Sequence, residues 1–80
     1  MTEKVRKPLE QMIAELNAVR RLMHKTYRHK KSGQHYTLMM AVFDEATNEL
    51  MAVYCLVAWT QLKFTRPMAE FVEKFEESKA

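Results

Sequence analysis

Apolar residues recur at helical spacing in the first part of the chain, with Pro8 at a position that suits a first helical turn. Cations cluster in the last two turns of this pattern, where they complement the helix dipole. We therefore predict a helix over about residues 8–24. Its apolar stripe consists of Leu9, Met12, Ile13, Leu16, Val19 and Met23.

Two segments rich in β-branched and aromatic residues follow, HYTLMMAVF at 35–43 and LMAVYCLVAW at 50–59. The polar segment DEATNE at 44–49 separates them, and its length suits a hairpin connection. A third strand is expected in QLKFT at 61–65, because Leu62 and Phe64 alternate there with polar residues.

Strict alternation along the first of these segments gives two apolar faces instead of one. It assigns Tyr36, Leu38, Met40 and Val42 to one face, and Met39, Ala41 and Phe43 to the other. A sheet with one solvated face would show polar residues at every second position. We therefore expect both faces to be covered, in part by a short helix that begins after Pro67 and in part by the first helix or by a second subunit in a homodimer.

These elements predict an α+β fold with an N-terminal amphipathic helix, a small three- to four-stranded antiparallel sheet that is barrel-like, and a short C-terminal helix. The 80 residues are expected to form a single domain over 1–80, with an N-terminal helical extension at 1–25 and a strand-rich core that carries the C-terminal helix at 26–77. No apolar run has the roughly 18–20 residues of a membrane span, and the first residues lack the apolar block of a signal peptide. The single cysteine, Cys55, lies in an apolar segment typical of an inert buried thiol, so we expect a cytoplasmic protein.

Charge is unevenly distributed along the chain. Residues 1–31 hold nine Lys or Arg against three Glu, whereas residues 32–80 hold four Lys or Arg against seven acids. The basic part could attract an anionic partner, the acidic tail of the same molecule, or the acidic tail of a second copy.

Polar, aromatic and cationic side chains surround the only glycine, Gly33. A binding patch is one interpretation, since Tyr and His rings stack on bases and Lys or Arg neutralises phosphate. The other interpretation is structural: the rings fill the sheet edge and the lysines keep that edge from pairing. The candidate binding residues are Tyr27, Arg28, His29, Lys30, Lys31, Tyr36 and Arg66.

Other kinds of chemistry find little support. The three histidines are five and six residues apart, which matches no standard zinc site, so we expect no metal and no cofactor. No nucleophile–base constellation or phosphate loop is present, so we do not expect an enzyme. Six Lys or Arg lie between Arg20 and Lys31, but no helix-turn-helix, zinc-finger or RNA-binding signature accompanies them.

Several short motifs occur in a fixed order over about residues 26–75. Tyr27, His29, Lys31, Gly33 and Tyr36 come first, Val53 and Tyr54 follow, and Phe64, Arg66, Pro67 and Phe71 close the series. This order resembles a small bacterial and bacteriophage domain family of unknown function with the pattern YxH[FY]KGxxY, then VVY, then WVRPxxxF. The chain departs from that pattern at Lys30, where an aromatic is usual, and at Phe64, where Trp is usual. The resemblance implies a small strand-rich domain and brings no established activity.

Together these observations favour a non-enzymatic binding module. The resemblance implies a small bacterial or phage accessory protein that docks onto a host macromolecule, in the host cytoplasm if a phage encodes it. A protein partner is favoured over a nucleic acid bound by the same basic and aromatic residues. A further alternative is an oligomer that sequesters an anionic nucleotide-like ligand.

Overall fold

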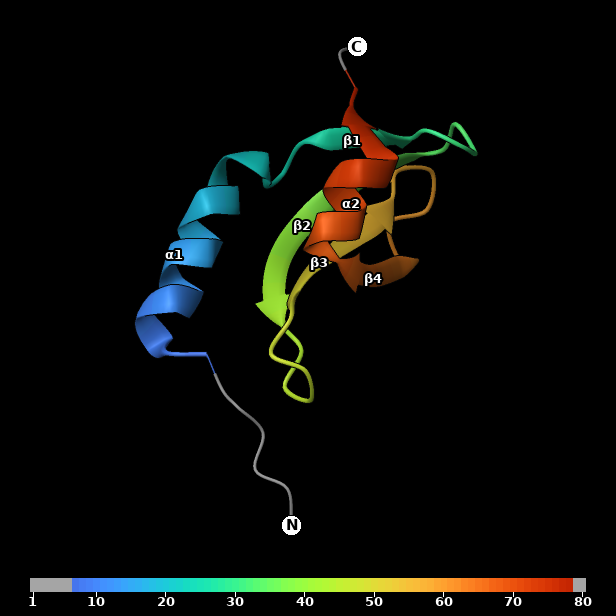
Figure 1. Ribbon diagram of the computed structural model, residues 1–80. Helices are drawn as coiled ribbons and strands as arrows, with labels where there is room; N and C mark the ends of the chain where they lie inside the picture. The colour runs from blue at the N-terminus through green and yellow to red at the C-terminus, as the bar shows by residue number, and fades with distance from the viewer. Residues whose placement is uncertain (1–6, 79–80) are drawn as a thin grey trace.

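The computed structural model describes residues 7–78, so residues 1–6 of the predicted extension and residues 79–80 lie outside it. Its strands form one antiparallel sheet in the order β4-β3-β2-β1-β5, with α2 lying across it (Figure 1). The elements are α1 (Leu9–Val19), a single 3-10 turn (Arg20–Leu22), β1 (Thr26–His29), β2 (His35–Phe43), β3 (Leu50–Leu56), β4 (Lys63–Pro67), α2 (Met68–Lys74) and β5 (Phe75–Glu77). The predicted α+β class is confirmed.

The sheet differs from the prediction in two respects. It has five strands, because the short polar segments β1 and β5 pair with each other and extend the predicted sheet beyond β2. It is also open and not barrel-like, since β4 and β5 lie at its two ends and do not pair with each other.

The first helix forms where the apolar stripe predicts it, but it does not lie over a face of the sheet. Its end at Val19 is followed by the 3-10 turn and by His24, whose φ of 63° is left-handed. α1 runs beside β2 at the edge of the sheet (Figure 1). Leu9 and Ile13 remain 71% and 49% exposed, and packing on the core comes from Val19 at the end of the helix and from Leu22 and Met23 just after it.

A β-bulge at Met39 changes which residues of β2 face the core. Leu38 pairs with Tyr54 and Met40 with Val53, so β2 contains one residue more than β3 across this step. As a result Ala41 lies against the core with Leu38, while Met40 and Val42 lie on the opposite face. The predicted face assignment, which put Met40 and Val42 with Leu38, is wrong because an extra residue inverts the alternation beyond it.

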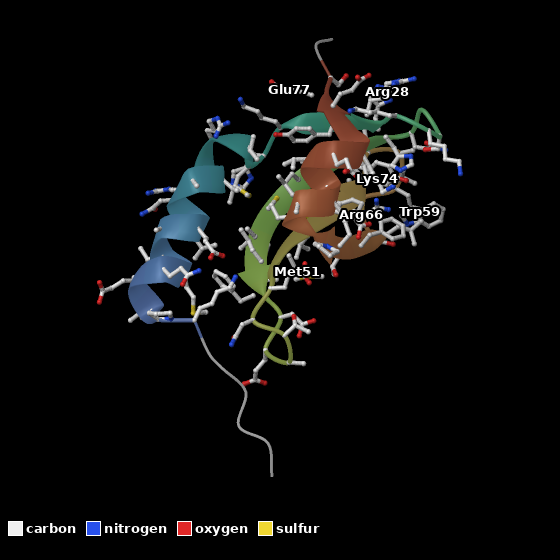
Figure 2. The ribbon with its side chains drawn as sticks, viewed as in Figure 1. Arg28, Met51, Trp59, Arg66, Lys74 and Glu77 are labelled. Atoms are coloured by element: carbon white, nitrogen blue, oxygen red, sulfur yellow. The ribbon has the colours of Figure 1, made fainter. Side chains whose placement is uncertain are left out.

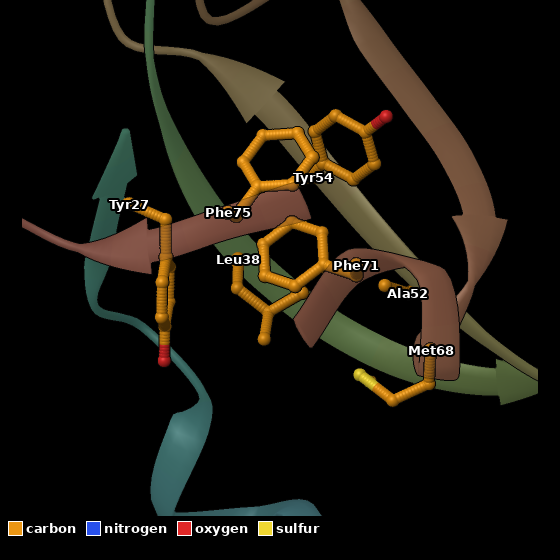
Figure 3. Close-up of a cluster of buried hydrophobic side chains, with 7 residues drawn as sticks. All are labelled: Tyr27, Leu38, Ala52, Tyr54, Met68, Phe71 and Phe75. Atoms are coloured by element: carbon orange, nitrogen blue, oxygen red, sulfur yellow. The ribbon is translucent and has the colours of Figure 1, made fainter. Parts of the chain in front are cut away.

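One face of the sheet carries the hydrophobic core, and α2 covers it (Figure 3). Phe71 of α2 and Leu38 of β2 are fully buried, and the rings of Phe71 and Phe75 stack with centroids 4.3 Å apart. Pro67 ends β4 and precedes α2, as its fixed φ favours. The predicted C-terminal helix is therefore confirmed and supplies most of the cover on this face.

The other face of the sheet has no helix over it within residues 7–78. Met40 and Val42 are 48% and 38% exposed there, and Met51 and Val53 are half-buried beside them. The expectation that both faces are covered is wrong for the single chain, because α1 is held at the edge by its packed end. Cys55 is a free, buried thiol, as the sequence predicts.

Candidate functional site

The pairing of β1 with β5 positions two of the cations of residues 20–31 beside acidic residues. It places Arg28 beside Glu76, with Nη1 and Oε2 2.8 Å apart, and Lys25 near Glu77, with Nζ and Oε2 3.8 Å apart. The acidic tail thus pairs with part of the basic segment of the same molecule, which is one of the three outcomes that the charge distribution allows. Neither of these two cations lines the cleft that the other charged candidates share.

Tyr27, a candidate from the sequence, lies in the core. It is 6% exposed, its ring packs edge-on against Phe71, and its hydroxyl donates a hydrogen bond to the Leu22 carbonyl at 2.8 Å. Burial, and next the charge of Glu77, raise the pKa of the Tyr27 hydroxyl. Tyr36 is half-buried, and its ring packs edge-on against those of Tyr54 and Phe75.

The other four candidates come together at one open cleft of about 480 Å³. His29 is the last residue of β1, Lys30 and Lys31 come from the turn between β1 and β2, and Arg66 comes from β4. Glu70, Glu73 and Lys74 of α2 complete the lining, and we call this set of seven residues the basic cleft. Figure 2 shows Arg66 and Lys74 close together beside α2.

The turn and α2 are joined by backbone as well as by side chains. The Lys30 N–H donates to the Lys74 carbonyl at 3.0 Å, and the Lys30 ammonium donates to the Glu73 carbonyl at 3.0 Å. Gly33 closes the turn with a φ of 79°, which a residue with a side chain rarely adopts. These contacts hold one wall of the basic cleft against the other.

Arg66 is the most firmly placed cation in the cleft. Its Nε donates to the Tyr54 hydroxyl at 3.0 Å, its Cζ lies 5.3 Å from the centroid of the Phe75 ring, and its Nη1 is 3.7 Å from Oε1 of Glu70. A guanidinium stacked on a ring and tied at Nε keeps its remaining N–H groups available in a fixed orientation.

His29 adds a neutral donor. The Ser32 N–H donates to Nδ1 of His29 at 3.1 Å, so the ring proton is on Nε2. Burial lowers the pKa of His29 most, and the charges of Arg66, Lys74 and Lys31 lower it further. At neutral pH the imidazole therefore stays uncharged among these cations.

Lys31 and Lys74 are the cations available to a ligand. Within residues 7–78, neither ammonium group makes an ion pair or a hydrogen bond. The basic cleft carries four permanent cations against the carboxylates of Glu70 and Glu73. It can therefore bind an anion, and the two carboxylates make its lining mixed in charge.

The sequence pointed to the turn residues and to Arg66 but missed the contribution of α2. A signal was present, because Arg66, Glu70 and Lys74 follow one another at a spacing of four residues, which brings side chains onto one side of a helix. Glu73 lies outside this spacing, and its backbone carbonyl accepts a hydrogen bond from the Lys30 ammonium.

Other candidate sites are not supported by the described part of the chain. Between residues 7 and 78, no group of three or more His, Cys, Asp or Glu side chains could hold a metal ion. In the same range, no helix has both the length and the apolar character to cross a membrane.

Comparisons with known protein families, with curated proteins and with solved structures give no match to this chain.

Proposed function

We propose that the protein is a non-enzymatic binding module that docks onto an acidic segment of a partner protein through the basic cleft. In keeping with the resemblance described above, it would serve as a small bacterial or phage accessory protein acting on a host protein. The observation that carries this proposal is the convergence of Lys31, Arg66 and Lys74, from three separate segments, at one open cleft.

The cations of the cleft differ in how they would contribute. Arg66 is already oriented by Tyr54 and Phe75, so little conformational entropy is lost when it binds a carboxylate. Lys31 and Lys74 are exposed and would attract an acidic segment over a longer range. Binding should therefore depend on charge at the lysines and on geometry at Arg66.

A protein partner accounts for this lining better than a nucleic acid does. Glu70 and Glu73 line the cleft, and their negative charges would repel a phosphate backbone, whereas an acidic protein segment can place donors beside them. Lys25 and Arg28 are also paired with the acidic residues of β5, so the basic segment offers no continuous track for phosphates.

The test compares two charge reversals of the same kind. Lys31→Glu places a negative charge in the cleft, whereas Lys63→Glu makes the same change on β4, where the ammonium only donates to the Thr60 carbonyl at 3.1 Å. Affinity capture from a bacterial lysate should recover one stoichiometric partner with the wild type and with Lys63→Glu, and lose it with Lys31→Glu.

A defined probe separates the partner classes. Fluorescence anisotropy with a Glu-rich peptide should show binding that Lys31→Glu weakens and Lys63→Glu leaves unchanged. Gel shifts with duplex DNA, single-stranded DNA and RNA at low salt should show no complex. Tight binding of a nucleic acid in preference to the peptide, or equal loss of peptide binding in both variants, would count against the proposal.

A further inference from the structure

The face of the sheet that carries the core has an exposed apolar end beside β4. Leu62 and Phe64 remain 48% and 40% exposed there. Phe64 lies on the core face because it pairs with the buried Tyr54, and the centroids of the two rings are 5.8 Å apart. The Leu62 carbonyl accepts from the Leu56 N–H in the same register, which puts Leu62 on the same face as Phe64.

Aromatic rings connect Phe64 to the basic cleft. The Phe64 centroid lies 6.0 Å from that of Tyr36, and the Tyr36 centroid lies 5.5 Å from that of Phe75. Phe75 in turn contacts two residues of the cleft, with its centroid 4.8 Å from that of the His29 ring and 5.3 Å from Cζ of Arg66. The exposed apolar end and the cleft are therefore two parts of one surface. We call Tyr36, Leu62 and Phe64 the apolar shelf.

The spacing between the two parts follows from β4. Phe64 and Arg66 are two residues apart on this strand, so their side chains leave the same face of the sheet about 7 Å apart. The guanidinium of Arg66 is held in place by Tyr54 and Phe75. A ligand that contacts both parts therefore needs a negative group and a large apolar group at about this separation.

We propose that the acidic segment bound by the basic cleft also carries a large apolar side chain, two positions from a carboxylate, that packs on the apolar shelf. This inference rests on the proposed function, since the cleft has to bind the acidic residue. In an extended segment, residues two positions apart point to the same side and lie about 7 Å apart, which matches the spacing of Phe64 and Arg66. The partner is thus recognised by an acidic and a large apolar residue in alternation.

Charge complementarity selects this occupant over a purely apolar one. The cleft beside the shelf carries four cations against two carboxylates, and an apolar partner would leave this excess of positive charge without a counterion. An acidic segment answers Lys31 and Arg66, while its apolar side chain is removed from water on Leu62 and Phe64.

A nucleic acid fits the shelf less well than this segment does. A base could stack on Phe64, but Leu62 is aliphatic and has no ring on which a second base could stack. Glu70 and Glu73 line the neighbouring cleft, and their charges would repel the phosphate attached to that base.

The test compares two fluorescein-labelled peptides of identical composition by fluorescence anisotropy. The alternating peptide, Gly-Ser-Glu-Ser-Glu-Ser-Phe-Ser-Gly, has its Phe two positions after a Glu. The shifted peptide, Gly-Ser-Glu-Ser-Glu-Phe-Ser-Ser-Gly, has its Phe next to a Glu and therefore on the opposite side of the extended chain. We expect the wild type to bind the alternating peptide about tenfold more tightly, because only this peptide buries its ring on the shelf.

Variants of the shelf assign this preference to its residues. Phe64→Ala should remove the preference and Leu62→Ser should reduce it, while affinity for the shifted peptide stays unchanged and shows that the cleft is intact. Val42→Ala is the matched control, because Val42 is exposed to a similar degree on the opposite face of the sheet, and it should keep the preference. A preference that survives both shelf substitutions overturns the inference.

The outcomes separate this inference from the proposed function. Equal affinity of the wild type for both peptides, lost with Lys31→Glu, leaves the cleft as an acid-binding site and overturns the role of the shelf. If neither peptide binds, both proposals are wrong. Tighter binding of an oligothymidylate than of the alternating peptide, weakened by Phe64→Ala, shows that the shelf stacks bases and also overturns the inference. The comparison of peptides needs only the wild type, so it remains decisive if Phe64→Ala fails to fold.

Discussion

Nε of Arg66 donates a hydrogen bond to the hydroxyl of Tyr54 at 3.0 Å, which connects the basic cleft to the hydrophobic core. Tyr54 is buried on β3, and its ring contacts those of Phe71 and Phe75. The guanidinium is therefore positioned by the same residues that hold α2 on the sheet. The geometry of the cleft should depend on the core as much as on its own charges.

Tyr54→Phe tests this connection by removing the acceptor while keeping the ring. We expect a loss of about 1 kcal/mol in the free energy of unfolding, because one part-buried hydrogen bond is lost. Affinity for the Glu-rich peptide should fall about fivefold for a similar cost. Chemical denaturation and peptide titration measure the two effects.

The matched control for this change is Tyr36→Phe. The Tyr36 hydroxyl makes no hydrogen bond with any residue of the described chain, so the same deletion should change stability by less than about 0.5 kcal/mol. Equal effects of the two substitutions would mean that Arg66 is not positioned through Tyr54.

Phe71→Ala should be the most damaging single substitution in α2. Phe71 is fully buried between Tyr27, Tyr54 and Phe75, so its removal leaves a cavity and should lower the free energy of unfolding by about 3–5 kcal/mol. Its neighbour Val72 is 52% exposed, and Val72→Ala should cost less than about 0.5 kcal/mol. Thermal unfolding of the two variants measures the contrast, and similar melting temperatures would contradict the placement of α2.

Tyr27→Phe should loosen the end of α1 more than the sheet. The hydroxyl of Tyr27 holds the Leu22 carbonyl at 2.8 Å, so its loss should cost about 1 kcal/mol. Amide hydrogen exchange should accelerate in α1 and in the residues that join it to β1. Protection in β3 should fall only as far as the global free energy of unfolding falls. Uniform acceleration over the whole chain would show that this contact does not act locally.

Stability should fall as the solution is acidified through the ordinary pKa of histidine, about 6.5. Burial and the neighbouring cations lower the pKa of His29 in the folded chain, so in this range the unfolded chain binds more protons. The contribution of His29 is therefore complete above pH 6.5 and is lost as the pH falls towards its lowered pKa. Denaturation curves between pH 8 and pH 5 should show a steeper decline for the wild type than for His29→Gln, and parallel curves would contradict this account.

The periodicity of apolar residues predicted the elements in which these residues alternate or recur at helical spacing. The helix at α1, the hairpin of β2 and β3, the third strand and the helix at α2 all lie where the apolar pattern places them. β1 and β5 were missed because they are four and three residues long and are largely polar. They are strands because they pair with each other, and the ion pair of Arg28 with Glu76 across that pairing is not visible in the sequence.

The candidate site, like the fold, was predicted only in part. The turn around Gly33 was recognisable from its composition, and it does supply Lys30 and Lys31 to the basic cleft, next to His29 at the end of β1. The burial of Tyr27 and the outward direction of Arg28 follow from alternation along a strand that the sequence did not indicate. The bulge at Met39 depends on how β2 fits β3, so no local signal marks it.

Pro67, at the last position of β4, also limits how far chains of this protein can polymerise. A sheet with two receptive borders can add subunits head to tail without end, which is how fibres begin. At the border formed by β4, Pro67 has no N–H to offer and Lys63 places a charge, and both features discourage the pairing of a further strand there.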